Sequence, residues 1–161
     1  MQTIQVICVG KCSAAYFSTA AAEYEKRLGG YCKIQVTELT EETIHEKSAS
    51  EAVIAKALEK EADAIMSTVK RGAAVVAMCI EGKQLSSEEL SLFLADKAQS
   101  GAGDVAFIIG SSHGLAPCVK QQAACRLSMS KMTFPHGLAR VMLLEQIYRA
   151  FTITAGAKYH K

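Results

Sequence analysis

The sequence predicts an α/β fold in which a largely parallel sheet is flanked by helices. Short apolar runs of strand length alternate along the chain with segments whose apolar residues recur at helical spacing. Two of these runs, 73–80 and 105–110, are apolar throughout, which is typical of parallel strands buried on both faces. The chain of 161 residues contains no linker, repeat or low-complexity run, so residues 1–161 are expected to form one domain.

The first half of the chain predicts two strands, each followed by a helix. Residues 3–10 form a β-branched, apolar run, and residues 33–39 alternate between apolar and polar side chains. Between them, Ser18 can cap a helix that runs to about Leu28. After a polar, acidic loop at 40–50, a second helix is predicted by apolar positions at Ala52, Ala55, Leu58, Ala62 and Ile65.

The second half continues this alternation of strands and helices. The run at 73–80 is followed by the sequence SSEE at 86–89, which resembles a capping box at the start of a helix. The strand at 105–110 is followed by a short helix at 119–124 and a short strand at 126–132. A long helix begins after Pro135, with one broad apolar face made by Leu138, Val141, Met142, Leu144, Ile147 and Phe151.

The composition is that of a globular protein with no membrane segment. Half of the residues are apolar and 21% are charged. The apolar stretch at residues 1–11 is too short for a signal peptide or a membrane helix. The formal net charge of +2 is too small to attract nucleic acid by bulk electrostatics, so contact with RNA must depend on local clusters or on oligomerisation.

The cysteines are predicted to be reduced thiols, in or near the core of a cytoplasmic protein. They are Cys8, Cys12, Cys32, Cys79, Cys118 and Cys125. None forms a C-x-x-C pair, and most lie in apolar stretches. A zinc site made by Cys118, Cys125 and His113 matches no common ligand spacing, so no metal is expected.

Residues 110–114, GSSHG, match the G-x-S-x-G pattern of serine hydrolases. In that interpretation Ser112 is the nucleophile, and Glu145 and His160 follow it in the chain order of such hydrolases. The same residues also fit a glycine-rich turn between a strand and a helix. The chain is short for the hydrolase fold, which favours the turn.

Three predicted strand ends together offer glycines, small polar residues and apolar residues, with almost no charge. They are Met78 to Gly82, Ile109 to Ser111, and Met129 to Thr133. Ligands of parallel sheets bind beyond the carboxyl ends of the strands. A lining of this kind suits an adenine-sized group that is held by backbone donors and acceptors. It suits a polyphosphate poorly, because the chain has neither a Walker sequence nor G-x-G-x-x-G.

The C-terminal helix and tail carry groups that could contact RNA. Arg140 and Arg149 can neutralise phosphate, and Tyr159 and His160 can stack on an unpaired base. The same residues also fit a solvated helix face and a frayed chain end.

The sequence SMSKMTFPHGLARVMLLEQIYRAF, followed by KYHK at the end of the chain, closely resembles the ribosomal RNA large subunit methyltransferase H family of small bacterial SPOUT enzymes. The segments VICVGK, AEYEKRL and IEGKQLSSEE resemble this family too, so the likeness spans nearly the whole chain. The family usually has two glycines where this chain has Gly110 and Ser111, and Gln where it has Gly137. Its segment before the terminal YHK is usually more charged than residues 154–157 here.

The resemblance implies an S-adenosylmethionine-dependent enzyme of rRNA processing, which methylates N3 of a pseudouridine in 23S rRNA of the assembled 70S ribosome. It also implies a C-terminal trefoil knot, a homodimer and a cytoplasmic location. Carried over by position, the cofactor-binding residues are Met78, Gly110, Met129, Ser130, Lys131, Met132, Thr133 and Phe134.

Several residues are candidates for the catalytic steps. The general base could be His160, Tyr159, Glu145 or His136. We hypothesise that Tyr159 and His160 hold the target base and that Arg140 positions the base or a phosphate. Two other functions stay open at this stage, namely the serine hydrolase and a non-catalytic ribosome-binding factor with the same fold.

Overall fold

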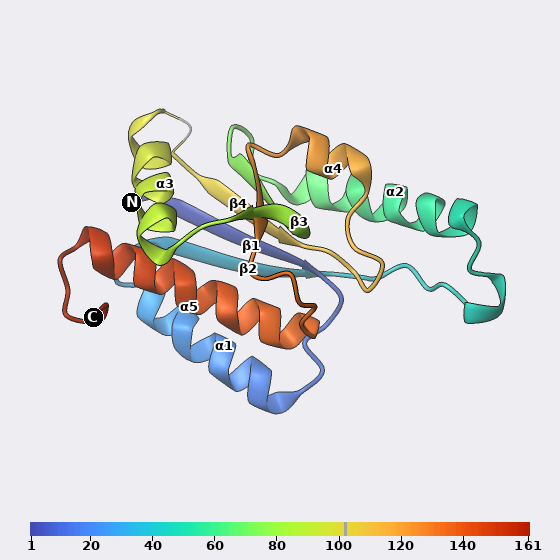
Figure 1. The fold of residues 1–161 in the computed structure, drawn as a ribbon, viewed down its shortest axis with the longest axis horizontal. Coiled ribbons are helices and arrows are strands. Elements are labelled where there is room, and N and C mark those ends of the chain that lie inside the picture. The colour runs from blue at the N-terminus through green and yellow to red at the C-terminus, as the bar shows by residue number, and fades with distance from the viewer. Residues whose placement is uncertain (102) are drawn as a thin grey trace.

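The computed structural model describes residues 1–101 and 103–161, and Figure 1 shows its arrangement of strands and helices. The strands are β1 (Thr3–Val9), β2 (Lys33–Leu39), β3 (Ala74–Gln84), β4 (Val105–Ile109) and β5 (Cys125–Ser128). The helices are α1 (Ala15–Leu28), α2 (Glu51–Thr68), α3 (Ser87–Gln99), α4 (Pro117–Gln122) and α5 (His136–Thr154), with a short 3-10 turn at Glu46–Ser48.

The five strands form one parallel sheet in the spatial order β2-β1-β4-β3-β5. Helices connect successive strands, as parallel pairing requires. Because all strands point the same way, their carboxyl ends meet at one edge of the sheet. The α/β fold with a parallel sheet that was predicted from the sequence is confirmed.

Helices cover both faces of the sheet with separate apolar clusters. In β1, Ile4 and Val6 pack toward α1, α3 and α5, whereas Ile7 and Val9 pack toward α2 and α4. These four side chains are at most 1% exposed, which is why the strand reads as a continuous apolar run rather than an alternating one.

The strand β3 is longer than predicted, because it continues past Ile80 to Gln84. Its ladder with β5 is irregular, and both Met78 and Lys83 pair with Leu127. A Cβ atom on Gly82 would lie 2.7 Å from the carbonyl of Arg126, so only glycine permits this close passage. Apart from Gly82, the extension consists of exposed polar residues, and it is stabilised by pairing with β5 rather than by an apolar pattern of its own.

Of the two N-caps predicted from the sequence, the one for α1 is wrong and the one for α3 is confirmed. The helix α1 begins at Ala15 with Ala14 at its N-cap, so the cap predicted at Ser18 is wrong. The Ser18 hydroxyl lies inside the first turn and donates to the Ala15 carbonyl at 3.0 Å. At α3 the capping box is confirmed, since the Ser86 hydroxyl accepts from the Glu89 amide at 3.1 Å and the Glu89 carboxylate accepts from the Ser86 amide at 2.8 Å.

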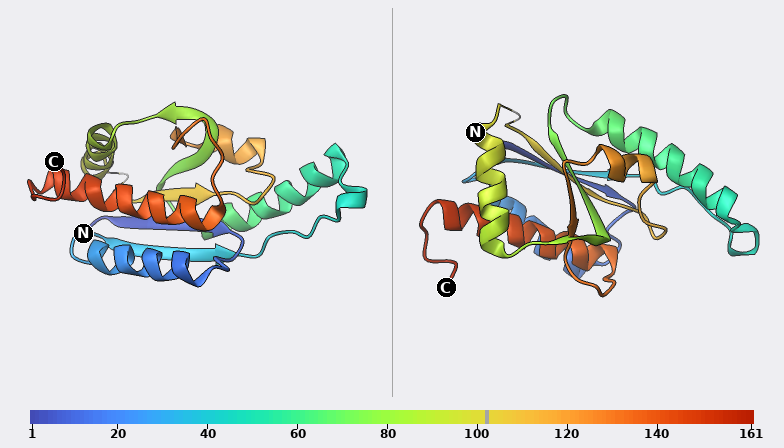
Figure 2. Two further views of the ribbon diagram at one scale, coloured as in Figure 1. Left: turned by 60° about the horizontal axis from the view of Figure 1, so that its bottom comes forward. Right: turned by 45° about the horizontal axis from the view of Figure 1, so that its top comes forward.

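Residues 40–60, which we call the arm, project from the sheet and include the first turns of α2 (Figures 1 and 2). The predicted helix is present, but Ala52 and Ala55 are exposed rather than part of its buried face. Burial begins only at Glu61, Ala62 and Ile65, where α2 reaches the sheet.

The cysteines occupy different environments. All six are free, and Cys8 and Cys32 are buried. Cys118 is exposed, so its predicted position in or near the core is wrong. In the part of the chain that the structure describes, no helix is both long and apolar enough to span a membrane.

Candidate active site

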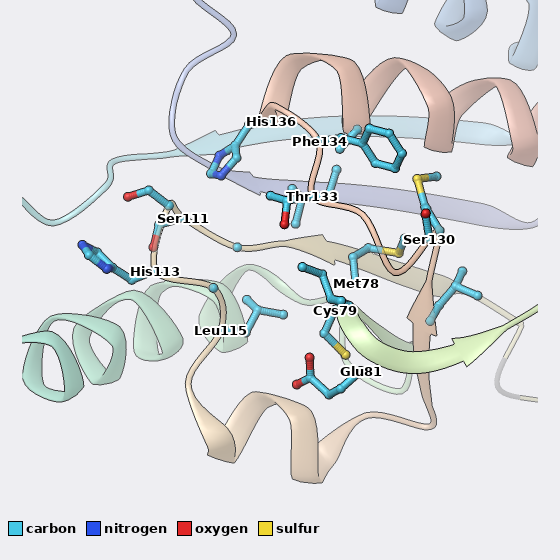
Figure 3. A pocket seen from close by; sticks show the side chains of 18 of the residues that line it. Met78, Cys79, Glu81, Ser111, His113, Leu115, Ser130, Thr133, Phe134 and His136 are labelled. Atoms are coloured by element: carbon cyan, nitrogen blue, oxygen red, sulfur yellow. The ribbon is translucent and has the colours of Figure 1, made fainter. Parts of the chain in front are cut away.

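A cavity of about 440 Å³ opens at the carboxyl edge of the sheet (Figure 3). Its walls come from the end of β3, the loop after β4, and the segment that joins β5 to α5. The residues that line it are Met78, Cys79, Ile80, Glu81, Ile109, Gly110, Ser111, Ser112, His113, Gly114, Leu115, Lys120, Leu127, Met129, Ser130, Met132, Thr133, Phe134, His136 and Ala139.

Seven of the eight cofactor-binding residues predicted from the resemblance line this cavity. They are Met78, Gly110, Met129, Ser130, Met132, Thr133 and Phe134. Lys131 is the exception, and it is an exposed residue outside the lining. The three strand ends selected from the sequence are therefore brought together, as their shared position at the ends of parallel strands requires.

The segment after β5 is shaped by local hydrogen bonds of two serines. The Ser128 hydroxyl donates to the Ser130 carbonyl at 2.9 Å, and the Ser130 hydroxyl accepts from the Met132 amide at 3.0 Å. These bonds turn the chain away from the sheet before α5 begins at His136. The turn leaves Thr133 and Phe134 beside the cavity (Figure 3).

Gly110 is required by the fold of its own loop. A Cβ atom there would meet the carbonyl oxygen of Gly114 and would lie 2.9 Å from the side chain of Leu115. Gly114 itself has a φ of +85°, which a side chain would strain. The two glycines thus allow the chain after β4 to fold back tightly against the cavity.

Two carboxylates fix this loop to the arm and to α2. The Glu41 carboxylate accepts from the hydroxyl of Ser112 at 2.7 Å and from its amide at 3.1 Å. The Glu61 carboxylate accepts from the Ser111 hydroxyl at 2.8 Å and from the Glu42 amide at 3.0 Å. Neither carboxylate was predicted as part of the site, although Glu61 lies at helical spacing between Leu58 and Ile65, where an acid on an apolar stripe is a signal of a buried partner.

Charged residues also reach the cavity, which the sequence analysis expected to be almost uncharged. Lys120 of α4 pairs with Glu81 of β3 at 2.5 Å. The hydrogen bond from Lys120 is the main cause that holds the pKa of Glu81 below its ordinary value. His113 and His136 stand on the opposite side (Figure 3). No signal in the sequence indicated that Lys120 would face this site.

Arg140 lies inside the protein and not on the surface where an RNA contact was predicted. Its side chain is only 8% exposed, and its guanidinium pairs with Glu38 of β2 at 2.6 Å. The hydrogen bond from Arg140, followed by one from the Cys12 amide, lowers the pKa of Glu38. The Nε atom of Arg140 has no hydrogen-bond partner among the described residues. In this arrangement Arg140 joins α5 to β2.

The C-terminal tail folds back on α5, away from the cavity of its own chain. The Tyr159 hydroxyl donates to Glu145 at 3.1 Å, and its ring lies edge-on to Tyr148 and under the guanidinium of Arg149. His160 contacts Glu88 at 2.8 Å. Arg140, Tyr159 and His160, to which the sequence analysis gave roles in catalysis, do not line the cavity of their own chain, whereas His136, another general-base candidate, does.

The arrangement does not support the serine hydrolase. The Ser112 hydroxyl donates to Glu41, while Glu145 and His160 engage other partners at the tail. A nucleophile elbow needs a strained backbone, but no non-glycine residue in the described ranges has a positive φ. Within the same ranges, no group of three or more His, Cys, Asp or Glu side chains could hold a metal ion.

Comparison with known proteins gives a consistent assignment. Residues 1–160 match the family described as "Predicted SPOUT methyltransferase". The ribosomal RNA large subunit methyltransferase H of Streptococcus uberis is 46% identical over 158 residues, covering 98% of this chain and 99% of the relative. The protein of the same name from Clostridium acetobutylicum is 47% identical over 159 residues, with the same coverage.

The chain is also similar to a solved structure, that of the SpoU methyltransferase AviRb from Streptomyces viridochromogenes in complex with AdoMet. It matches 98% of this chain and 60% of its own length, with a TM-score of 0.48 and 10% identity.

The fold and the cavity define an α/β protein with a candidate ligand site at the carboxyl edge of a parallel sheet. The chain belongs to the SPOUT methyltransferase family, and within it to the ribosomal RNA large subunit methyltransferase H family. The family assignment made from the sequence is confirmed, and the enzyme is a methyltransferase.

Proposed function

We propose that this enzyme transfers the methyl group of S-adenosylmethionine to N3 of a pseudouridine in 23S rRNA of the assembled 70S ribosome. The observation that carries the proposal is the cavity of about 440 Å³, whose walls are the strand-end segments that the family resemblance assigns to the cofactor. Bound there, S-adenosylmethionine supplies a methyl group already activated by its sulfonium charge.

The lining is compatible with this cofactor. Met78, Leu127 and Phe134 offer apolar surface to an adenine ring, and the turns at Gly110 and Ser130 offer backbone donors and acceptors. Glu81 and Lys120 form an ion pair that could reorganise around a ligand carrying both an amino and a carboxylate group. The chain's own part in catalysis is to hold the methyl donor and the nucleophile in line.

The position of the tail supports a site shared between two subunits. The tail contacts Glu145, which lies nine residues beyond His136 along α5, or about 14 Å at the rise of a helix. We infer that Tyr159 and His160 act on the target base in the cavity of a partner subunit. A second cavity of about 460 Å³ beside α5, lined by residues that include Leu85, Leu90, Val141 and Met142, offers apolar surface for a homodimer.

Further properties follow from the family rather than from the geometry. We propose a trefoil knot formed by the C-terminal part of the chain, a single SPOUT domain at 1–161, and a cytoplasmic location. An assembled particle is the favoured substrate, because a net charge of +2 gives little general attraction to RNA phosphate.

The test is transfer of labelled methyl from S-adenosylmethionine to ribosomes that lack the modification, followed by nucleoside analysis. Whole ribosomes, separated subunits and deproteinised RNA are compared at the same salt concentration. We expect N3-methylpseudouridine only with whole ribosomes. Equal rates on naked RNA would contradict recognition of the particle, and binding without any transfer would indicate the non-catalytic factor instead.

A further inference from the structure

A carboxylate and two imidazoles gather at the side of the cavity where α5 begins. Glu41 comes from the arm, His113 from the loop after β4, and His136 from the first position of α5. His113 and His136 line the cavity itself (Figure 3). Arg140, Glu145, Tyr159 and His160 do not line the cavity, so His136 is the one group suggested for catalysis from the sequence that belongs to this cluster.

Glu41 is held in place as an anion. It accepts both hydrogen bonds from Ser112, at 2.7 and 3.1 Å. Burial opposes its ionisation, but these hydrogen bonds and the charges of His136 and His113 outweigh burial and hold the pKa of Glu41 below its ordinary value. A half-buried carboxylate with a lowered pKa stays charged at neutral pH and favours the protonated form of a neighbouring imidazole.

Glu41 and His136 face each other across Gly10, where β1 ends. A Cβ atom on Gly10 would lie 3.4 Å from Oε2 of Glu41 and 3.9 Å from Nδ1 of His136. Gly10 has a φ of +102°, and its lack of a side chain leaves the space between the two groups open. Nδ1 of His136 is the ring nitrogen closest to this gap, which leaves Nε2 for a molecule in the cavity.

Other charged groups near His136 are paired, since Arg140, one turn further along α5, binds Glu38 of β2 at 2.6 Å. His113 faces the same carboxylate from the loop after β4, and Glu81 and Lys120 across the cavity neutralise each other. The N-terminus of α5 disfavours a positive imidazolium. The Glu41 carboxylate beside His136 acts in the opposite sense, because an anion favours a positive imidazolium.

We propose that His136 is the proton acceptor of the methyl transfer and that Glu41 is its positioning residue. This proposal rests on the function proposed above. In the balanced step, N3 of the target base forms a bond to the methyl carbon, and the carbon–sulfur bond breaks with its electron pair left on sulfur. The N3 proton passes to Nε2 of His136, and the imidazolium that forms is stabilised by Glu41 before it releases the proton to water.

The first experiment measures single-turnover methyl transfer to whole ribosomes as a function of pH. In the wild type, the rate rises as pH increases through the pKa of His136, because only the neutral imidazole accepts a proton. His136→Gln lowers the rate about 10²–10⁴-fold, the usual contribution of a general base, and removes that rise. Glu41→Gln moves the rise to lower pH, because loss of the anion makes the imidazole less basic. His45→Gln, an exposed arm residue outside the cavity lining, is the matched control.

The second experiment does not depend on activity. The dissociation constant of S-adenosylhomocysteine, measured by calorimetry, should be within two-fold of wild type for His136→Gln and for His136→Asn. An NMR titration of the imidazole of His136 in the free protein should show a lower pKa in Glu41→Gln than in the wild type.

Two results would overturn the assignment of His136. One is a wild-type rate and pH profile in both His136 variants, and the other is weakened cofactor binding with an unchanged rate at saturation. If the wild-type enzyme does not methylate ribosomes at all, the proposed function fails. The NMR titration still decides in that case whether Glu41 acts on His136, and an unchanged pKa refutes the pairing.

Discussion

The Ser111 hydroxyl donates a hydrogen bond to the Glu61 carboxylate at 2.8 Å, and both residues are only 5% exposed. The same carboxylate accepts from the amide of Glu42, so one acidic side chain of α2 joins the loop of the cavity to the arm. The pair lies beneath the candidate ligand site and ties its loop to α2.

Removal of the Ser111 hydroxyl should destabilise the protein and loosen the loop. In Ser111→Ala, the buried carboxylate of Glu61 loses one of its two donors, which should lower the free energy of unfolding by about 1–3 kcal/mol. Urea unfolding measures this change, and calorimetry should show weaker binding of S-adenosylhomocysteine. Ser67→Ala, on the exposed side of α2, is the control and should change stability by less than about 0.5 kcal/mol. Equal stability of the two variants would contradict the role given to Ser111.

Gly110→Val should abolish cofactor binding by distorting the loop rather than by blocking the ligand. The new side chain would be directed at Gly114 and Leu115 of the same loop. Titration with S-adenosylmethionine should show no binding, while circular dichroism retains the α/β spectrum. Lys131→Ala, at an exposed position outside the lining, should bind as the wild type does. Unchanged affinity of folded Gly110→Val would mean that the cofactor binds elsewhere.

Loss of Glu38 should destabilise the protein more than loss of its partner Arg140 does. Glu38→Ala leaves a guanidinium that is 8% exposed without its anion, which should cost about 3 kcal/mol in the free energy of unfolding. Arg140→Leu should cost less, because the Glu38 side chain is 37% exposed and can be hydrated. Urea unfolding of both variants tests the order, and the reverse order would contradict the burial argument.

The same pair predicts a pH dependence of stability. The pKa of Glu38 is lower in the folded state than in the unfolded state, where it is about 4.3. The ionised carboxylate therefore contributes fully to the free energy of unfolding above the unfolded-state pKa, and this contribution is lost as pH falls through the lower, folded-state pKa. Wild type should therefore lose more stability between pH 5 and pH 3 than Arg140→Leu does. Parallel curves for the two proteins would show that Arg140 does not stabilise the anion of Glu38.

The cysteines should remain unpaired and react at very different rates. Burial raises the pKa of both Cys8 and Cys32 to about 11, although Arg140 partly opposes this shift at Cys8. At pH 8, iodoacetamide should therefore label exposed Cys118 quickly, and Cys8 and Cys32 only after unfolding. Mass spectrometry without reductant follows the labelling. A disulfide present in most molecules would contradict the prediction of a reducing compartment.

Subunit mixing tests whether the site is shared. The enzyme should be a dimer at micromolar concentration by light scattering. A heterodimer that combines one Gly110→Val subunit with one Tyr159→Ala subunit should regain about half of wild-type activity, because one of its two sites would be intact. Each variant alone should be inactive. An inactive heterodimer, or a monomeric wild type, would place the tail on its own subunit's cavity.

The sequence was sufficient to predict the architecture. Apolar runs such as 105–110 and helical spacing in the final helix depend on local periodicity, and burial on both faces follows from strands without alternation. The strand ends at Met78, Gly110 and Met129 were also correctly grouped, since parallel strands place their carboxyl ends together. Two predictions from local sequence were wrong. Ser18 does not cap the first helix, because the helix begins earlier, at Ala15. The strand β3 extends to Gln84, beyond its apolar segment, because it pairs there with β5.

By itself, the sequence determined the fold class, the family and the segments that surround the cavity, because these depend on periodicity and on contiguous motifs. Only the tertiary structure decided that Arg140 is buried against Glu38, and that Glu41 of the arm and Glu61 of α2 hold the loop. Those contacts join residues 50 to 102 positions apart in the chain. No local pattern specifies such partners, because they meet only where the packing of helices on a parallel sheet brings their side chains together.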